Sequence, residues 1–296
     1  MALVINHNLM AMSASRYLSI SYGRLATSVS RLASGLRITS AADDAAGLAI
    51  RETMRTDIRV LGQGVRNAND AMSLIQTADG ALSVIDEKLT RMKELAEQAA
   101  TGTYTTAQRL IMDSEYQAMA SEITRIAKAT DFNGVKLLDG SLSGTAGTPG
   151  TTGQRLKIHF GTGNASAEDY YYIAINASTA SALGVGNSIG VGTAGRTIST
   201  QAGAQGCLAA IDSAINTKDN IRANLGALSN RLANTVSNLT IQAENLQAAE
   251  SRISDVDVAT EMTEFVRNQI LTQAAVAMLA QANSLPQLAL QLIGNG

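Results

Sequence analysis

Few side chains in this sequence could carry out chemistry. His7 and His159 are the only histidines, and neither has a partner at a spacing typical of a metal site. Cys207 is the only cysteine and has no histidine arranged to activate it. The adjacent carboxylates Asp43 and Asp44 could suggest acid–base catalysis, but the negatively charged start of a helix explains them better. The sequence therefore predicts no enzyme, no metal site and no cofactor.

Composition and charge argue against several kinds of partner. The chain has 296 residues, of which 25 are acidic and 23 are basic, so we expect no bulk electrostatic attraction to nucleic acid. The longest uncharged stretch, residues 268–296, carries polar residues every few positions, and we expect no membrane span there. Residues 1–22 lack a basic region followed by an apolar run, so we expect no cleaved signal peptide. If the protein leaves the cell, a different export route must carry it.

The N-terminal end carries a helical pattern. Apolar residues recur in alternating steps of four and three, the heptad spacing that keeps one stripe of a helix facing a partner helix. The stripe consists of Leu18, Tyr22, Leu25, Val29, Leu32 and Leu36. Similar runs occupy residues 61–99, with a phase slip near Ala78, residues 112–126 and residues 232–246. The sequence thus predicts a mainly α protein of long helices.

The C-terminal tail repeats the pattern without charge. Its apolar stripe consists of Val266, Ile270, Ala274, Met278 and Ala282, and no charged residue follows Arg267. A helix cannot bury such a stripe alone, so we expect the helices of the two ends to pack on each other as a coiled coil. Two interpretations of the tail remain open: a helix docked on its own domain, or a helix that becomes ordered only in an assembly.

A segment of different composition separates the helical ends. Residues 141–206 are rich in Gly, Ser and Thr and carry few charged side chains. Within this segment, residues 155–160 alternate polar and apolar side chains, and residues 170–175 are rich in aromatic and β-branched side chains. These patterns predict a small β-hairpin near residues 154–176, between long helices on either side.

Three blocks of sequence resemble a known family. Residues 34–50 read SGLRITSAADDAAGLAI and resemble the N-terminal signature of bacterial flagellins. Residues 252–257, 269–274 and 279–283 resemble the family's C-terminal signature, and residues 131–138 resemble the turn after its third helix. The blocks occur in the family's order, and the resemblance covers about residues 1–140 and 205–296. The chain looks like a minimal flagellin.

The resemblance implies an architecture and a function. Residues 1–42 and 256–296 would form a terminal coiled coil that lines the filament interior, and residues 43–255 would form a helical rod containing the hairpin. The middle segment is short, so we expect no separate outer domain. The implied function is a structural subunit that polymerises into the flagellar filament, a helical propeller for motility. A hook–filament junction protein of the same superfamily and a secreted helical effector remain as alternatives.

The resemblance also implies partners and a location. The partners are other copies of the chain, an export chaperone at the C-terminal segment, and the filament cap and hook-associated proteins. The filament lies outside the cell, and its subunits travel through the flagellar type III export channel. A patch that an animal Toll-like receptor contacts would consist of Leu89, Arg91, Leu95 and Glu122. Arg91 and Leu95 are four residues apart and would share one helix face.

Overall fold

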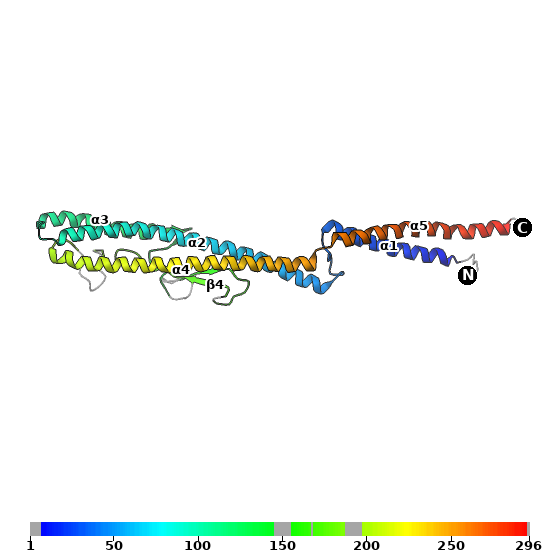
Figure 1. The fold of residues 1–296 in the computed structure, drawn as a ribbon, viewed down its shortest axis with the longest axis horizontal. Helices are drawn as coiled ribbons and strands as arrows, with labels where there is room; N and C mark the ends of the chain where they lie inside the picture. Colours follow the sequence, from blue (N-terminus) through cyan, green and yellow to red (C-terminus); the bar gives the residue numbers. More distant parts are fainter. Residues whose placement is uncertain (1–6, 145–154, 167, 187–196, 295–296) are drawn as a thin grey trace. The chain divides into compact units, whose positions relative to one another are not determined.

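Long helices at both ends of the chain enclose a short region of strands. The computed structural model describes residues 7–144, 155–166, 168–186 and 197–294, with side chains described as far as residue 284. The helices are α1 (Leu9–Ser34), α2 (Ala45–Ala100), α3 (Thr106–Ala129), α4 (Gln201–Ser254) and α5 (Val258–Gly294) (Figure 1). The strands are β1 (Asp131–Phe132), β2 (Val135–Lys136), β3 (Leu156–His159) and β4 (Tyr170–Ile173). The predicted mainly α fold, with a small hairpin region in its middle, is confirmed.

None of the described helices combines the length and the apolar character that a membrane span requires.

The chain divides into two compact units. Unit 1 consists of residues 1–58 and 244–296, and unit 2 consists of residues 59–243. The described helices break at residues 35–44 and 255–257, close to the boundaries that the sequence placed at 42 and 256. The contacts, however, group the first part of α2 and the last part of α4 with the terminal helices. The division into a terminal coiled coil and a rod therefore stays a prediction.

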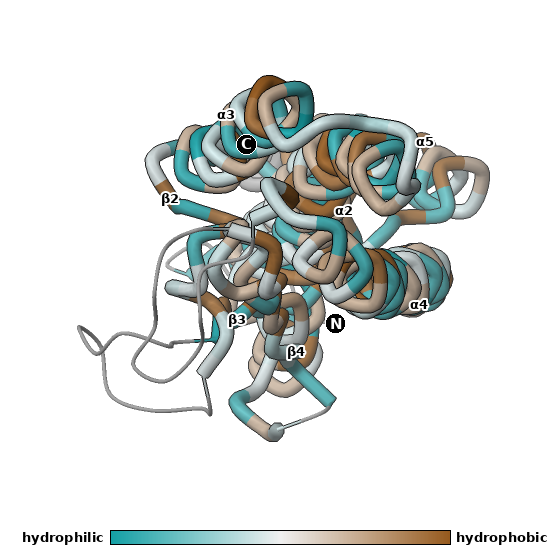
Figure 2. Tube along the Cα trace, turned by 90° about the vertical axis from the view of Figure 1, so that its left-hand side faces the viewer, coloured by the Kyte–Doolittle hydropathy of each residue, from teal (hydrophilic) through white to brown (hydrophobic). Residues whose placement is uncertain are grey.

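In unit 2, one face of α2 is buried along the helix. The buried positions alternate in steps of three and four. Some hold small residues, such as Gly64, Ala71 and Ala78, and others hold larger ones, such as Leu82 and Ile85. Residues of α3 and α4 complete the core, among them Tyr116, Ile123, Ile211, Ile221, Leu225 and Leu232. Figure 2 shows hydrophobic and hydrophilic residues alternating along the helices, as expected of amphipathic helices. The phase slip predicted near Ala78 is wrong, because small side chains keep the heptad pattern continuous there.

Ion pairs join α2 to α4 in unit 2. They are Asp79–Arg222, Asp86–Lys218 and Lys93–Asp212. The residue numbers rise along α2 as they fall along α4, so the two helices are antiparallel. Burial alone would lower the pKa of Lys218, but hydrogen bonds from its ammonium to Asp219 and Asp86 outweigh burial and raise that pKa. A buried cation is tolerated only beside its partners, so this pair disfavours any other register of the two helices.

Two antiparallel hairpins lie in unit 2. In the first, Phe132 of β1 pairs with Val135 of β2 across a two-residue turn, in which Asn133 and Gly134 have φ values of 50° and 80°. In the second, strands β3 and β4 pair from Leu156↔Ile173 to His159↔Tyr170. This second hairpin is the one that the sequence predicted near residues 154–176.

Gly64 lets the end of the second hairpin approach α2. A Cβ atom at Gly64 would lie 2.0 Å from the carbonyl oxygen of Phe160. The side-chain amide of Asn67 donates a hydrogen bond of 2.8 Å to the carbonyl of His159 and holds the same segment. The close backbone approach thus depends on the absence of a side chain at position 64.

We predict that Gly64→Ala destabilises unit 2 by about 2 kcal/mol or more, because the backbone at Phe160 must move. The matched control is Gly80→Ala on the same helix, where an added Cβ meets nothing within 4 Å. That control should gain up to about 1 kcal/mol from helix propensity. The free energy of unfolding of each variant is measured by chemical denaturation, monitored by circular dichroism. Equal stabilities of the two variants would contradict the close approach of Phe160 to Gly64.

Candidate functional site

In unit 1, α1 and α5 lie side by side and share a narrow seam (Figure 1). The shielded positions of both helices alternate in steps of three and four. On α1 they are Ala11, Ala14, Leu18, Ser21, Leu25, Ser28 and Leu32. On α5 they are Glu261, Phe265, Asn268, Thr272, Ala275, Leu279 and Ala282. Most of these side chains are small or polar, so the seam buries little apolar surface.

The stripe predicted on α1 has the right period, but only half of its members face α5. Three of its members lie in the seam: Leu18, Leu25 and Leu32. Tyr22 and Val29 are exposed, and the seam contains the preceding residues Ser21 and Ser28 instead. Leu36 is half-buried beyond the end of the helix, where it forms a β-bridge with Asp255. Hydropathy placed the larger side chains inward, whereas the structure places the smaller ones there.

The stripe predicted on α5 faces away from α1. Its first four members, Val266, Ile270, Ala274 and Met278, are all exposed. Only Ala282 is buried in the seam. Apolar residues occur on every side of this helix, so hydropathy could not determine which face meets α1. A role of the exposed residues in polymerisation stays a prediction.

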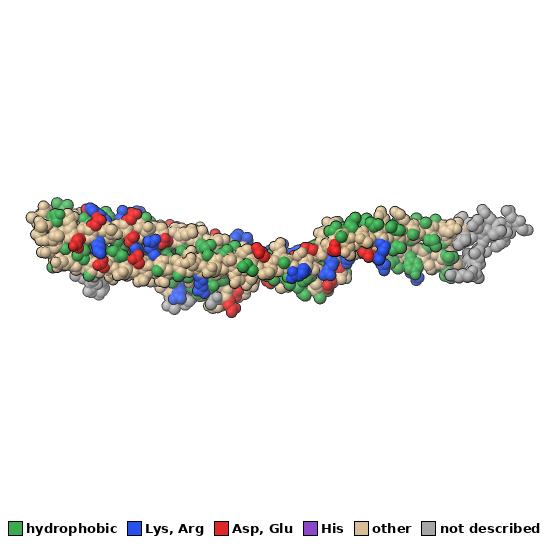
Figure 3. All heavy atoms as spheres, in the orientation of Figure 1, with side chains coloured by type: hydrophobic (Ala, Val, Ile, Leu, Met, Phe, Trp, Pro, Cys, Tyr) green, Lys and Arg blue, Asp and Glu red, His purple; other side chains and the backbone are tan. Residues whose placement is uncertain are grey.

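Many large apolar side chains of this helix pair are exposed, and Figure 3 shows hydrophobic patches on one face of the pair. On α1 they are Leu9, Met10, Met12, Tyr17, Ile20, Tyr22 and Val29, and on α5 they are Val258, Met262, Val266, Ile270, Leu271, Val276 and Met278. We call these residues the outer apolar surface. Monomeric proteins rarely expose so many large apolar side chains together, and such a surface typically marks a site of protein association.

Polar contacts within the seam are few. The side-chain amide of Asn8 donates to the carbonyl of Ala282 at 2.7 Å, and the Arg31 guanidinium lies 3.6 Å from the Glu261 carboxylate. The buried Oδ1 atom of Asn268 accepts no hydrogen bond from the described residues. An unsatisfied buried acceptor is unfavourable, so the Oδ1 atom of Asn268 does not favour the pairing of α1 and α5.

The two breaks between helices are bound to each other in unit 1. The backbone N–H of Arg37 donates to the carbonyl of Ser254 at 2.7 Å, and that of Val256 donates to the carbonyl of Gly35 at 3.1 Å. The Arg37 guanidinium also donates to the carbonyl of Ile253 at 2.8 Å. Gly35 has a φ of 71°, which side-chain-bearing residues rarely adopt. We call this arrangement the joint, and both sequence blocks that resemble the flagellin signatures contribute to it.

Carboxylates organise the helix starts at the joint. Asp44 accepts a hydrogen bond of 2.9 Å from the N–H of Gly47 at the start of α2, which supports the helix-start interpretation of the Asp43–Asp44 pair. Hydrogen bonds from Thr39 and Ser40 lower the pKa of Asp43. Hydrogen bonds from the Thr260 side chain and from the N–H groups of Thr260 and Ala259 lower the pKa of Asp257 at the start of α5.

We predict an acid-dependent contribution of Asp257 to stability. Its pKa in the folded chain lies below the ordinary value of 3.8, so the contribution is present above that value and is lost as pH falls through the depressed pKa. The stability difference between the parent chain and Asp257→Ala should therefore narrow in acid, as measured by thermal unfolding at several pH values. Gln273→Ala on the exposed side of α5 serves as control. A stability difference between the parent chain and Asp257→Ala that does not change with pH would contradict this role of Asp257 at the start of α5.

The structure corrects the predicted receptor patch in unit 2. Leu89 and Leu95 are core residues, with exposed fractions of 0% and 2%, and cannot contact a partner in the folded chain. Arg91 lies at the surface and binds Glu115 of α3 at 2.9 Å. Glu122 is also at the surface and pairs with Arg125. Only the two charged members of the predicted patch are therefore accessible.

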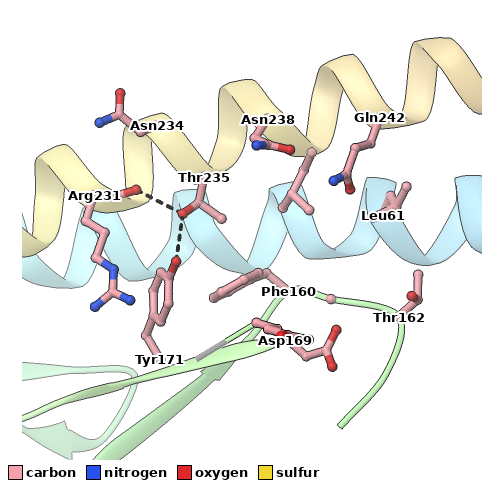
Figure 4. A pocket seen from close by; sticks show the side chains of 13 residues that line it. Leu61, Phe160, Thr162, Asp169, Tyr171, Arg231, Asn234, Thr235, Asn238 and Gln242 are labelled. Carbon is pink, nitrogen blue, oxygen red and sulfur yellow. Dashed lines mark hydrogen bonds between the residues drawn. The ribbon is translucent and has the colours of Figure 1, made fainter. Parts of the chain in front are cut away.

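A groove of about 470 Å³ lies between the second hairpin and α4 in unit 2 (Figure 4). The Arg231 guanidinium lies 3.6 Å from the centre of the Tyr171 ring, and the Thr235 hydroxyl donates to the Tyr171 oxygen at 3.5 Å. Asp169 accepts hydrogen bonds from the N–H groups of Gly163 and Ala165 in its own loop. The groups at this groove contact one another and anchor the hairpin on α4, which is a structural role.

Comparison with known proteins identifies relatives along the whole chain. Models of the bacterial flagellin N-terminal helical region and the bacterial flagellin C-terminal helical region match residues 5–143 and 208–293. Flagellin of Halalkalibacterium halodurans is 42% identical over 291 residues, covering 98% of this chain and 100% of that protein. Flagellin FlaB1 of Treponema pallidum is 40% identical with the same coverage. Flagellin of Bacillus subtilis is 42% identical over 305 residues, covering 98% of this chain and 99% of that protein.

A helical chain whose terminal helix pair exposes many large apolar side chains has the character of a structural protein that associates with other subunits. The chain belongs to the bacterial flagellin family. It is a structural subunit of the flagellar filament and not an enzyme, as the sequence predicted. Membership in this family implies self-polymerisation.

Proposed function

We propose that the outer apolar surface of α1 and α5 is the contact through which copies of this flagellin polymerise. The supporting observation is that the helix pair buries polar side chains and exposes large apolar ones. Ser28, Asn268 and Thr272 are buried, whereas Tyr22, Ile270 and comparable side chains are exposed. Burying one large apolar side chain contributes about 1.5–3 kcal/mol. A contact between chains supplies this burial, whereas the seam within one chain does not.

We further propose the layered arrangement that the family resemblance implies. Residues 1–42 and 256–296 form the coiled coil that lines the filament interior, and residues 43–255 form the rod around it. The charges that unit 2 carries along its helices suit a layer that meets water. The apolar character of the terminal pair suits a layer enclosed by other copies.

The polymerisation proposal makes a matched prediction. Ile270 of α5 and Ile241 of α4 have similar exposed fractions, 59% and 55%, but Ile270 belongs to the outer apolar surface and Ile241 does not. Ile270→Gln should raise the concentration needed for polymerisation by about tenfold, because the contact loses apolar burial. Sedimentation and electron microscopy after addition of filament seeds measure this concentration.

Ile241→Gln is the control and should polymerise at nearly the parent concentration. Circular dichroism establishes that both variants remain folded. An equal loss of polymerisation in both variants would place the contact elsewhere. Parent chains that sediment only as short, non-elongating species would favour the hook–filament junction alternative.

Export and end partners complete the proposal. The chain travels to the cell exterior through the flagellar type III channel. A cytoplasmic chaperone holds the C-terminal segment, about residues 253–292, because the exposed apolar residues of α5 would otherwise associate too early. The filament cap and the hook-associated proteins meet the first and last subunits of the polymer. Truncation of this segment should abolish chaperone capture in a pull-down.

We also propose that an animal Toll-like receptor contacts the monomer at Arg91 and Glu122, the accessible members of the predicted patch. Arg91→Ala should reduce receptor activation by about tenfold, because an arginine contact at such an interface is often worth that much. A reporter assay with monomeric protein measures activation. Lys128→Ala, at the last turn of α3, is the control. Full activation by Arg91→Ala would remove this residue from the contact.

A further inference from the structure

Exposed methionines are confined to the terminal helix pair. Among the methionines whose side chains the structure describes, those with large exposed fractions are Met10 (49%), Met12 (67%), Met262 (43%) and Met278 (60%). All of them lie on α1 or α5. The remaining described methionines, Met54, Met72, Met92, Met112 and Met119, are buried or half-buried on α2 and α3. Oxidisable side chains are thus concentrated on the outer apolar surface.

Three of the exposed methionines line grooves beside the seam in unit 1. Met10 and Met278 border an apolar groove of about 400 Å³, which Leu9 and Tyr17 also line. Met12 borders a second groove of about 630 Å³, together with Ile20 and Leu279. The three sulfur-bearing side chains therefore lie where a neighbouring copy would insert its own side chains. Met262 lines neither of these two grooves.

Oxidation would change the character of these grooves. In the reaction, a lone pair of the thioether sulfur attacks one oxygen of hydrogen peroxide, the O–O bond breaks, and proton transfer releases water. The sulfur is oxidised by two electrons, the peroxide is reduced by two, and the product is a sulfoxide. A sulfoxide is polar and carries a strong hydrogen-bond acceptor, so it disrupts apolar contacts that a methionine favours.

We propose that Met10, Met12 and Met278 form a reversible oxidation site that prevents the unpolymerised chain from assembling in the presence of peroxide. The inference rests on the proposed role of the outer apolar surface in polymerisation. In the free chain these thioethers are open to the oxidant, and in the polymer the neighbouring copy covers them. Assembly therefore protects the same sulfur atoms whose oxidation would block it.

The site is reversible because sulfoxides can be reduced. Methionine sulfoxide reductases return each epimer to the thioether, with a dithiol as the electron donor, which becomes a disulfide while the oxygen leaves as water. Cys207 is buried in unit 2, whereas the residues that line these grooves belong to unit 1. The proposed oxidation site thus consists only of thioethers on the terminal helices.

The test compares oxidised and untreated chains. Monomers are treated with hydrogen peroxide, the peroxide is removed, and peptide mass spectrometry verifies oxygen addition at Met10, Met12 and Met278. Polymerisation from seeds is then followed by sedimentation. The concentration needed for polymerisation should rise by about tenfold or more, because apolar burial is lost at three positions. Reduction by methionine sulfoxide reductases A and B with dithiothreitol should restore the original value.

Variants assign the effect to the grooves. A chain with Met10→Leu, Met12→Leu and Met278→Leu keeps apolar side chains and should lose most of the parent chain's sensitivity to peroxide. Met262→Leu is the matched control, an exposed methionine outside the two grooves, and should stay as sensitive as the parent. Undiminished polymerisation of the oxidised parent, or equal sensitivity of the triple variant, would overturn the proposal.

A second measurement uses the parent chain alone. Oxygen addition at Met10, Met12 and Met278 should be slower in preformed filaments than in monomers. Equal rates of oxygen addition in filaments and monomers would contradict the proposal that assembly protects these methionines. If the untreated parent does not polymerise through this surface, as judged by Ile270→Gln, the proposed function fails; if it does and oxidation has no effect, only the oxidation site fails.

Discussion

Small side chains at the contacts between helices are the constraint on which the rest of the structure depends. In unit 2, Gly64, Ala71 and Ala78 face inward along α2, and Gly64 lets the backbone at Phe160 approach closely. In unit 1, Ser21 and Ser28 of α1 occupy inward positions opposite α5. Because Ser21 and Ser28 occupy inner positions of α1, the adjacent larger residues Tyr22 and Val29 face outward. The surface that suits assembly is thus a consequence of how each helix pair packs.

The two units use electrostatics differently. In unit 2, ion pairs such as Asp79–Arg222 disfavour every alignment of α2 and α4 but one, and Lys218 adds a buried cation that must keep its partners. In unit 1, the α1–α5 seam has Arg31–Glu261 near one end and uncharged residues along the rest. Unit 2 therefore has a fixed helix register, and unit 1 has an apolar exterior. A subunit needs the first property to keep its own fold and the second to associate with other copies.

Much of the fold could be predicted from the sequence, because heptad spacing, the Asn133–Gly134 turn and the strand patterns near residues 154–176 are local signals. The phase of the seams could not be predicted. Apolar residues at Tyr22 and Val29 satisfy the same alternation as Ser21 and Ser28, and only the partner helix decides between the two choices. Gly64 gave no signal in the sequence, because its role depends on the backbone of Phe160. Leu89 and Leu95 were misassigned to a surface since core and contact residues have the same apolar character.

The pairing of α1 with α5 has a consequence for the time course of synthesis. The hydrogen bond from Asn8 to Ala282 joins residues separated by 274 positions, so the pair closes only after most of α5 has left the ribosome. A prematurely terminated chain has α1 but lacks its partner helix and half of the joint. The closed terminal pair therefore distinguishes chains whose synthesis has passed α5 from chains that stopped before it.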